Sequence, residues 1–488
     1  MKNSMPELVI ETDLNLTVFH LLSGLHQGLS RFSGQSRVAL IVAVKPNDPL
    51  CVCDPQDLLK EHKREVFDYY IQKNAWTQNL IGVNDSSGDS GKLVGCAELP
   101  GTISVGYSST GLFYQAWFAE HHQSAPGTGV IECWLNHCAY VLSCEPFRWG
   151  RPRVHPRTLG TALEWYTLQA IQGHLESELY GVVGRSSRLS IDDLLSDIAG
   201  ISTTYEEGRR ASGKLVIVEE ELLPNLNFLA YFPQSDTLRL GNWKHTRKLL
   251  STVQDTPLGL VSDGDRIVGV SSGRLPDYAL SIEFKSGRGE ISLNRVPVCT
   301  VSDGRFYSSR LTPNLEALGT ALNRIALRAK ATKRLLGIVS RIAETAIQER
   351  HGCTLVIDPT ETPADLAGQR LEPAIDLKPA KTLRLAFSMA KVGGALHIDV
   401  RGFLHAFGCI LDGSSVDNED HSRGARFNSA LRFSAVNENL IPVVISEDRH
   451  LFVFLHGIHL TEPPVHPPIS EIQAKPATVQ EWFGPERL

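Results

Sequence analysis

The order of apolar runs between His351 and Phe454 constrains the fold of this chain more than any other feature of the sequence. Runs of strand length alternate with helical segments, and turns that contain glycine or proline separate them. The expected strands are 353–358, 396–399, 403–411, 441–445 and 451–454, and the expected helices are 381–391 and 424–436. Helices interleaved with strands in this order predict a compact α/β unit with a mixed sheet.

The chain has 488 residues, and this length predicts several domains because single hydrophobic cores stop growing beyond roughly 250–300 residues. The N-terminal part mixes helical and strand patterns, so its fold class is expected to be α+β. The predicted divisions are an α/β domain at 1–175, a β-rich domain at 176–310, a helical connector at 311–334, the α/β unit at 335–460 and a proline-rich, extended tail at 461–488.

The β-rich segment contains the string Val-Ser-Asp-Gly twice, from Val261 to Gly264 and from Val301 to Gly304. Asp-Gly between apolar runs predicts a hairpin, because glycine accepts the positive φ of the turn. The two copies are interpreted as recurrences of a common turn rather than as a structural repeat.

Composition narrows the classes of function. The formal net charge of -6 provides no general basic field for nucleic acid or an anionic membrane, so neither partner is expected. No apolar run reaches the ~18 residues of a membrane-spanning helix, and the acidic N-terminus lacks a signal-peptide core. Nine cysteines in a chain of this length are too few for a disulfide scaffold, so a reduced, cytoplasmic protein is expected.

Histidines, cysteines and one glutamate gather in a short stretch of the N-terminal part: Glu120, His121, His122, Cys133 and His137. If residues 131–141 are helical, Cys133 and His137 share a face, as paired metal ligands do. The spacing matches no known zinc motif, and tryptophans interleave with these residues. Core packing, a zinc site and a pocket for a small ligand therefore all remain open.

The last third also carries residues that suit a nucleotide triphosphate. Gly394 lets the backbone approach a ligand closely. Gly424 precedes a helix whose first amides favour phosphate, and Arg426 and Ser429 in its first turn add donors. Acidic residues near strand ends could hold a divalent cation on the phosphates: Asp399, Asp412 and Glu447.

These residues resemble, in order and spacing, the DisA-type diadenylate cyclase domain, a family that joins two ATP molecules into cyclic di-AMP. The family motifs are Asp-Gly-Ala before a strand, Gly-Thr-Arg-His-Arg opening a helix, and Ser-Glu-Glu at a later strand end. Here they read Gly393-Gly394-Ala395, Gly424-Ala425-Arg426-Phe427-Asn428 followed by Ser429, and Ser446-Glu447-Asp448. The segments Phe118–His122 and Trp134–His137 resemble upstream sensor regions of one cyclase-like branch.

The resemblance implies a site and its partners. The catalytic positions are Gly393, Gly394, Ala395 and Asp412, the nucleotide-binding positions are Leu411, Gly424, Ala425, Arg426, Phe427, Asn428, Ser429 and Ser446, and Glu447 is the metal ligand. The implied substrate is ATP, with Mn²⁺ or Mg²⁺ as cofactor. The implied assembly is a face-to-face homodimer or larger oligomer, because one domain holds only half of the reactants.

Three departures from the family pattern leave a second function open. Gly393 replaces the aspartate that helps to hold the metal and activate the ribose 3′-hydroxyl, Phe427 replaces histidine, and Asn428 replaces arginine. Asp399 lies six residues beyond Gly393, about 20 Å along a straight strand, so Asp412 is the better candidate to replace the missing carboxylate. The alternatives are a degenerate cyclase fold that binds ATP or a cyclic dinucleotide as a sensor, and a structural protein without nucleotide.

Overall fold

The chain divides into two compact units. The computed structural model describes residues 5–78, 91–121, 128–144, 155–206, 209–233, 235, 237–308, 315–324, 329–348, 351–416, 419, 424–446, 451–460, 469 and 476–484. Unit 1 comprises Met1–Leu311 with His466–Leu488, and unit 2 comprises Thr312–Val465. Each unit is described by itself.

The described strands of unit 1 include an antiparallel sheet in the order β24-β2-β1-β5-β4-β3. Its strands are β1 (Val38–Ala43), β2 (Cys51–Cys53), β3 (Lys92–Val94), β4 (Thr102–Ser108), β5 (Tyr114–Glu120) and β24 (Ala477–Thr478). Successive residues of a strand point to opposite faces. Accordingly, Trp117 of β5 is buried in one apolar cluster and Phe118 in another, on the other side of the sheet.

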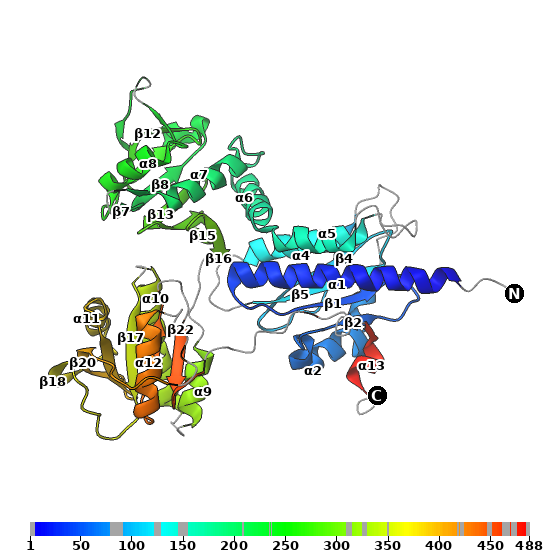
Figure 1. Ribbon diagram of the computed structural model, residues 1–488. Coiled ribbons are helices and arrows are strands. Elements are labelled where there is room, and N and C mark those ends of the chain that lie inside the picture. The colour runs from blue at the N-terminus through cyan, green and yellow to red at the C-terminus, as the bar shows by residue number, and fades with distance from the viewer. Residues whose placement is uncertain are drawn as a thin grey trace. The chain divides into compact units, whose positions relative to one another are not determined.

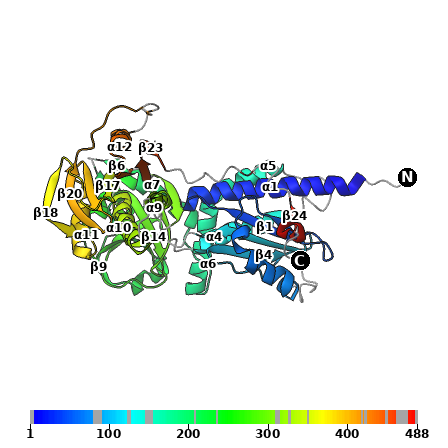
Figure 2. The same ribbon diagram turned by 90° about the horizontal axis from the view of Figure 1, so that it is seen from below.

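Helices cover both faces of this sheet (Figures 1 and 2). The long helix α1 runs beside α4 and α5 on the Trp117 face, and α2 and α13 lie on the other side (Figure 1). The bounds of the helices are α1 (Met5–Ser33), α2 (Lys63–Phe67), α3 (Ala75–Gln78), α4 (Thr128–Ser143), α5 (Pro156–Glu164), α6 (Thr167–Val183) and α13 (Val479–Phe483).

Glycines permit the close approach of α1 and α5. A Cβ atom added to Gly24 would overlap the carbonyl of Gly160, and one added to Gly160 would lie 2.5 Å from the His20 carbonyl oxygen. The two backbones therefore touch directly at this crossing, which only residues without a side chain allow.

The second sheet of unit 1 has the order β10-β12-β11-β8-β13-β14-β15-β16, and β9 also pairs with β12. Among the described strands of this sheet, β8 and β11 are the one pair of parallel neighbours. The helices α7 (Ile191–Thr203) and α8 (Trp243–Leu250) pack with this sheet. Its strands are β8 (Gly213–Ile217), β9 (Phe228–Tyr231), β10 (Leu238–Arg239), β11 (Gly259–Ser262), β12 (Arg266–Ser271), β13 (Leu280–Lys285), β14 (Arg288–Leu293), β15 (Val296–Ser302) and β16 (Arg305–Ser308), and β6 (Tyr205–Glu206) pairs separately with β7 (Arg209–Arg210).

Unit 2 is built on one mixed sheet in the order β18-β20-β19-β17-β21-β22-β23. In its described part β17 and β19 are the parallel pair, and the other neighbours are antiparallel. The strands are β17 (Cys353–Asp358), β18 (Gln369–Asp376), β19 (Ala395–Asp399), β20 (Phe403–Cys409), β21 (Ile441–Ile445), β22 (Leu451–Leu455) and β23 (Ile458–His459). The α/β fold with a mixed sheet that the sequence predicts is confirmed.

Helices cover the two faces of the unit 2 sheet, giving three layers (Figure 1). Apolar residues of α9 (Glu316–Arg324), α10 (Ala329–Gln348) and α11 (Ala380–Ala390) pack on one face, with Leu355, Ile398 and Leu404 in that core. The helix α12 (Ala425–Val436) packs on the other face, with Val356 and Ala406 beneath it.

Several elements differ from the expectation. The strand β18 occupies a segment between the expected strand 353–358 and the expected helix 381–391, where the sequence predicts no strand. Within the helical connector expected at 311–334, the described residues form α9 and the start of α10. The tail was expected to be extended or loosely ordered; in its described residues β24 pairs with β2, and a capping box of Thr478 and Glu481 begins α13. No helix in the described ranges has both the length and the apolar character that crossing a membrane requires.

Candidate nucleotide-binding site

Four strand ends meet at one edge of the unit 2 sheet. The register pairs Thr354 with Ala395 at the start of β17 and β19, which are parallel. It also pairs Ala395 with Cys409, at the end of β20, and Cys353 with Ile445, at the end of β21. Gly393, Gly394, Ala395 and Ser446 lie at or beside these ends, so the topology brings segments distant in sequence to one edge.

The two glycines before β19 differ in what they require. Gly394 has φ +80°, and a Cβ atom there would lie 2.5 Å from the carbonyl carbon of Gly408. A side chain at position 394 would therefore collide with Gly408, so glycine is required there for β19 to pair with β20. Gly393 has φ +37°, but a Cβ atom there would meet no atom within 4 Å. Gly393 thus stands in open space at the beginning of the strand.

The N-terminus of α12 lacks a side-chain cap. Gly424 is the N-cap residue and offers no side-chain cap, and its carbonyl accepts hydrogen bonds from the amides of Phe427 and Asn428. The first amides of a helix have no partner within the helix and carry partial positive charge. The beginning of α12 therefore suits an anionic group.

The Arg426 side chain reaches from α12 to the start of β17. A Cβ atom added to Gly352 would lie 2.5 Å from Nη1 of Arg426. Burial raises the pKa of the neighbouring Cys353 thiol to about 12, and the positive charge of Arg426 opposes that rise. The guanidinium group is thus held at the same edge as Gly394, and Arg426 is exposed to solvent there.

Phe427 does not have the position that the motif implies for its side chain. Its ring is buried against Phe452, Phe454 and His459, with ring centroids 4.9–5.3 Å apart. The ring thus packs between α12 and β22, and a role of Phe427 in nucleotide binding stays a prediction. Ala425 is exposed, and Asn428, Ser429 and Ser446 are partly exposed.

The segment after β20 turns away along α12. Leu411 is partly buried between two apolar clusters. A Cβ atom on Gly413 would lie 2.6 Å from the backbone carbon of Arg432, about 10 Å along the helix from Arg426. Asp412 itself is exposed and accepts a hydrogen bond from the Gly413 amide. Asp412 therefore lies next to a residue that packs on the second half of α12.

Asp399 lies at the opposite edge of the sheet, as the length of β19 predicts. It is buried, and it accepts hydrogen bonds from the Arg401 and Phe403 amides and from the Arg401 side chain. Burial by itself would raise the pKa of the Asp399 carboxyl, but these bonds and the contact with His405 lower it below its usual value. Asp399 thus stabilises the turn between β19 and β20.

The described residues do not form a metal site at the sheet edge near Gly394. Glu447, the predicted metal ligand, lies outside the described residues. Within the described part of the chain no three histidine, cysteine or acidic side chains stand close enough to hold an ion. The Mn²⁺ or Mg²⁺ that the resemblance implies therefore stays a prediction.

The histidine and cysteine cluster of unit 1 is divided between elements. Glu120 forms an ion pair with Arg37, and the His137 ring stacks on Tyr166 with centroids 4.0 Å apart. Burial lowers the pKa of His137 and raises that of Cys133 to about 11. His122 lies outside the described residues. Stacked and ion-paired side chains favour the packing interpretation of this cluster.

Three family models match the chain. Residues 341–458 match the DisA bacterial checkpoint controller nucleotide-binding family. Residues 12–184 match the probable sensor domain DACND, and residues 192–299 match the probable sensor domain DACNH. The first match spans the edge described above.

Two solved structures are similar to part of the chain. A hypothetical membrane-spanning protein from Bacillus cereus is 18% identical with a TM-score of 0.20, over 25% of this chain and 60% of that protein. A double mutant of DacA from Staphylococcus aureus is 20% identical with a TM-score of 0.21, over 27% of this chain and 87% of that one. The chain thus spans less than two thirds of the first of these proteins. No curated protein matches the chain.

Proposed function

We propose that this chain, which belongs to the DisA-type diadenylate cyclase family through residues 341–458, binds an adenine nucleotide at the edge formed by Gly394, Gly424 and Arg426. The match to this nucleotide-binding family supports ATP or an adenine dinucleotide as the ligand. The matches at 12–184 and 192–299 support a role of the N-terminal segments in sensing.

The proposal is supported by two features that meet at this edge, the first turn of α12 and the Arg426 side chain. The first turn of α12 has only a glycine cap, and Arg426 reaches over Gly352 from that turn. Amides at a helix N-terminus together with a guanidinium group form a site for phosphate. The side-chain position of Gly393, beside Gly394, is open space, so a ligand can approach the backbone there.

Signalling by binding is the function that this geometry supports best. Activation of a ribose hydroxyl requires a base or a metal ion, and Gly393 supplies no carboxylate. Asp399 is committed to a turn at the opposite edge, and Asp412 adjoins a residue that packs on Arg432. The domain would then bind a nucleotide, and the bound state would change the rest of the chain without a chemical reaction.

Synthesis of cyclic di-AMP is the second candidate. Arg426 is retained, and Ser446 follows β21 at the same edge, with Glu447 next in sequence. In this reaction the 3′-hydroxyl of each ATP attacks the α-phosphate of the other, so two phosphodiester bonds form and two pyrophosphates leave. Two domains would have to face each other, which makes a homodimer part of this candidate.

Calorimetric titration of the full chain with ATP and with cyclic di-AMP tests the proposal. Replacing Arg426 by alanine removes a charge-assisted contact worth about 1.5–3 kcal/mol, so Arg426→Ala should weaken binding by roughly 10- to 100-fold. The matched control is Arg384→Ala, an exposed arginine on α11 at the other face of the sheet, which should bind normally. Equal affinities of the two variants, or no binding by the parent chain, would refute a site at this edge.

A further inference from the structure

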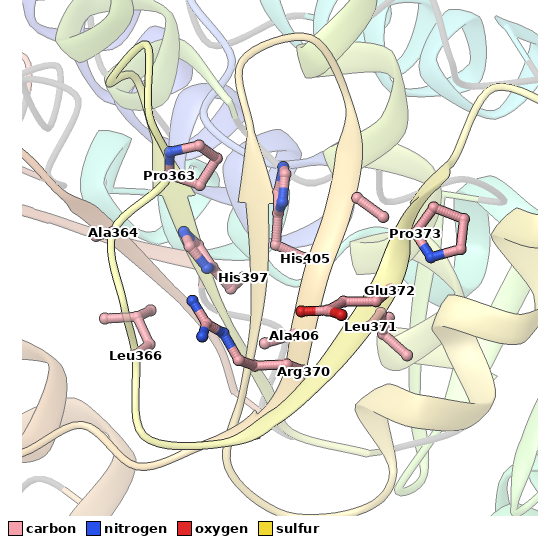
Figure 3. A pocket seen from close by; sticks show the side chains of 11 residues that line it. Pro363, Ala364, Leu366, Arg370, Leu371, Glu372, Pro373, His397, His405 and Ala406 are labelled. Carbon is pink, nitrogen blue, oxygen red and sulfur yellow. The ribbon is translucent and has the colours of Figure 1, made fainter.

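A cavity of about 190 Å³ lies in unit 2 where β18 separates from β20. The register pairs Arg370 with Ala406 and Ile375 with Leu404, so four residues of β18 lie opposite the single residue His405 of β20. The extra residues bow outward and open the space between the strands. Pro363, Ala364 and Leu366 close another side, and His397 and His405 line the cavity (Figure 3).

Each histidine is held by an aspartate behind it. His397 Nε2 lies 2.8 Å from the Asp358 carboxylate, and His405 Nε2 lies 3.1 Å from that of Asp399. Burial alone would raise the pKa of Asp358, but hydrogen bonds from His397, Thr360 and Ala364 lower it to about 2, so this carboxylate is ionised. Each ring thus uses Nε2 for its aspartate, which leaves Nδ1 as the nitrogen available to a ligand.

The charges around the cavity favour a cation. Glu372 and Arg370 line it, and the carboxylates of Asp358 and Asp399 lie behind its two histidines. Arg370 pairs with Asp365 and Arg401 with Asp399, whereas Glu372 makes no ion pair with the described residues.

The walls and the volume favour an organic ligand. Proline, leucine and alanine side chains form part of the lining, beside polar groups, and these apolar parts suit a short hydrocarbon chain. The volume is below the ~300 Å³ of typical pockets for drug-sized ligands, so a small molecule fits better. A nucleotide is much larger. Asp358 and Asp399 also end β17 and β19, so the cavity lies toward the edge opposite Gly394.

We propose that this cavity is a second ligand site of unit 2 and that it takes a small organic amine as its ammonium cation. The ammonium group donates hydrogen bonds to Nδ1 of the two histidines and to the Glu372 carboxylate. The carbon chain lies against the apolar walls. The site is independent of the nucleotide site, since it shares no residue with it.

The test is a titration of the full chain at pH 8 with 1,4-diaminobutane and with 1,4-butanediol, which has the same length but no charge. Binding of the diamine, without binding of the diol, is expected. Glu372→Gln and His405→Phe should each weaken it at least tenfold. Glu372 is exposed and His405 is partly exposed, so both variants should fold, which circular dichroism verifies. Arg426→Ala should bind the diamine normally even though its nucleotide binding fails.

Three results would overturn the proposal. Equal binding of diamine and diol would show that charge plays no part. Unchanged diamine affinity in both variants would place the amine elsewhere. Binding of Zn²⁺ lost in His405→Phe, without any binding of the diamine, would make the histidines ligands of a metal ion.

Discussion

Gly393 has the space that an aspartate would need but carries no carboxylate. A Cβ atom there meets nothing within 4 Å, and its φ of +37° is a value that aspartate and asparagine tolerate better than other residues. The neighbouring Gly394 is different, because Gly408 fills the position of a side chain. One position can therefore accept the family residue, and the other has to remain glycine.

Gly393→Asp is expected to produce cyclic di-AMP from ATP and Mn²⁺. A positioned base or metal ligand contributes about 10²- to 10⁴-fold to such a step, so product should rise at least 100-fold over the parent chain. Chromatography against a cyclic di-AMP standard measures it, and Gly393→Asn serves as a control of equal shape without charge. Robust synthesis by the parent chain would contradict the binding function.

Direct backbone contact between helices or strands determines the positions at which no side chain fits. The crossing of α1 and α5 is the clearest case, because Gly24 and Gly160 meet there without a side chain between them. Apolar periodicity predicts most strands of unit 2, since buried strands are continuous apolar runs. It does not predict β18, which contains Arg370, Glu372 and Pro373 and is bowed away from β20.

Gly24→Val should lower the free energy of unfolding by about 1–3 kcal/mol, because the added methyl groups force α1 and α5 apart. Chemical denaturation followed by circular dichroism measures the change. Gly173→Ala in α6 is the control, because a Cβ atom there meets nothing within 4 Å and should leave stability equal or higher. Equal stability of Gly24→Val and the parent would show that the crossing is not tight.

The site itself was only partly predictable. The order of motifs correctly brings Gly394 and Arg426 to one edge, because strand order determines which ends meet. Sequence could not show that Phe427 points into an aromatic cluster, since this depends on the packing of α12 against β22. Nor did it single out His397 and His405, whose spacing matches no motif and whose pairing with aspartates arises from strands that meet only in the fold.

In the whole molecule, one unit contains the segment that matches the nucleotide-binding family, and the other contains the two segments that match probable sensor domains. The boundary falls between Leu311 and Thr312, and the C-terminal residues return to unit 1 through β24. The segment that forms unit 2 is therefore flanked on both sides in the sequence by segments of unit 1. The chain thus connects unit 2 to unit 1 at two points, through which ligand binding in unit 2 can act on unit 1.

Hydrogen–deuterium exchange of the full chain, with and without ATP, tests the central claim most directly. Bound phosphate should slow exchange of the amides at 393–395 and 424–429, because it accepts hydrogen bonds there and excludes water. Protection of both segments is expected in the parent chain, and its loss is expected in Arg426→Ala. Protection confined to unit 1, or no change at either segment with ATP in excess, would contradict it.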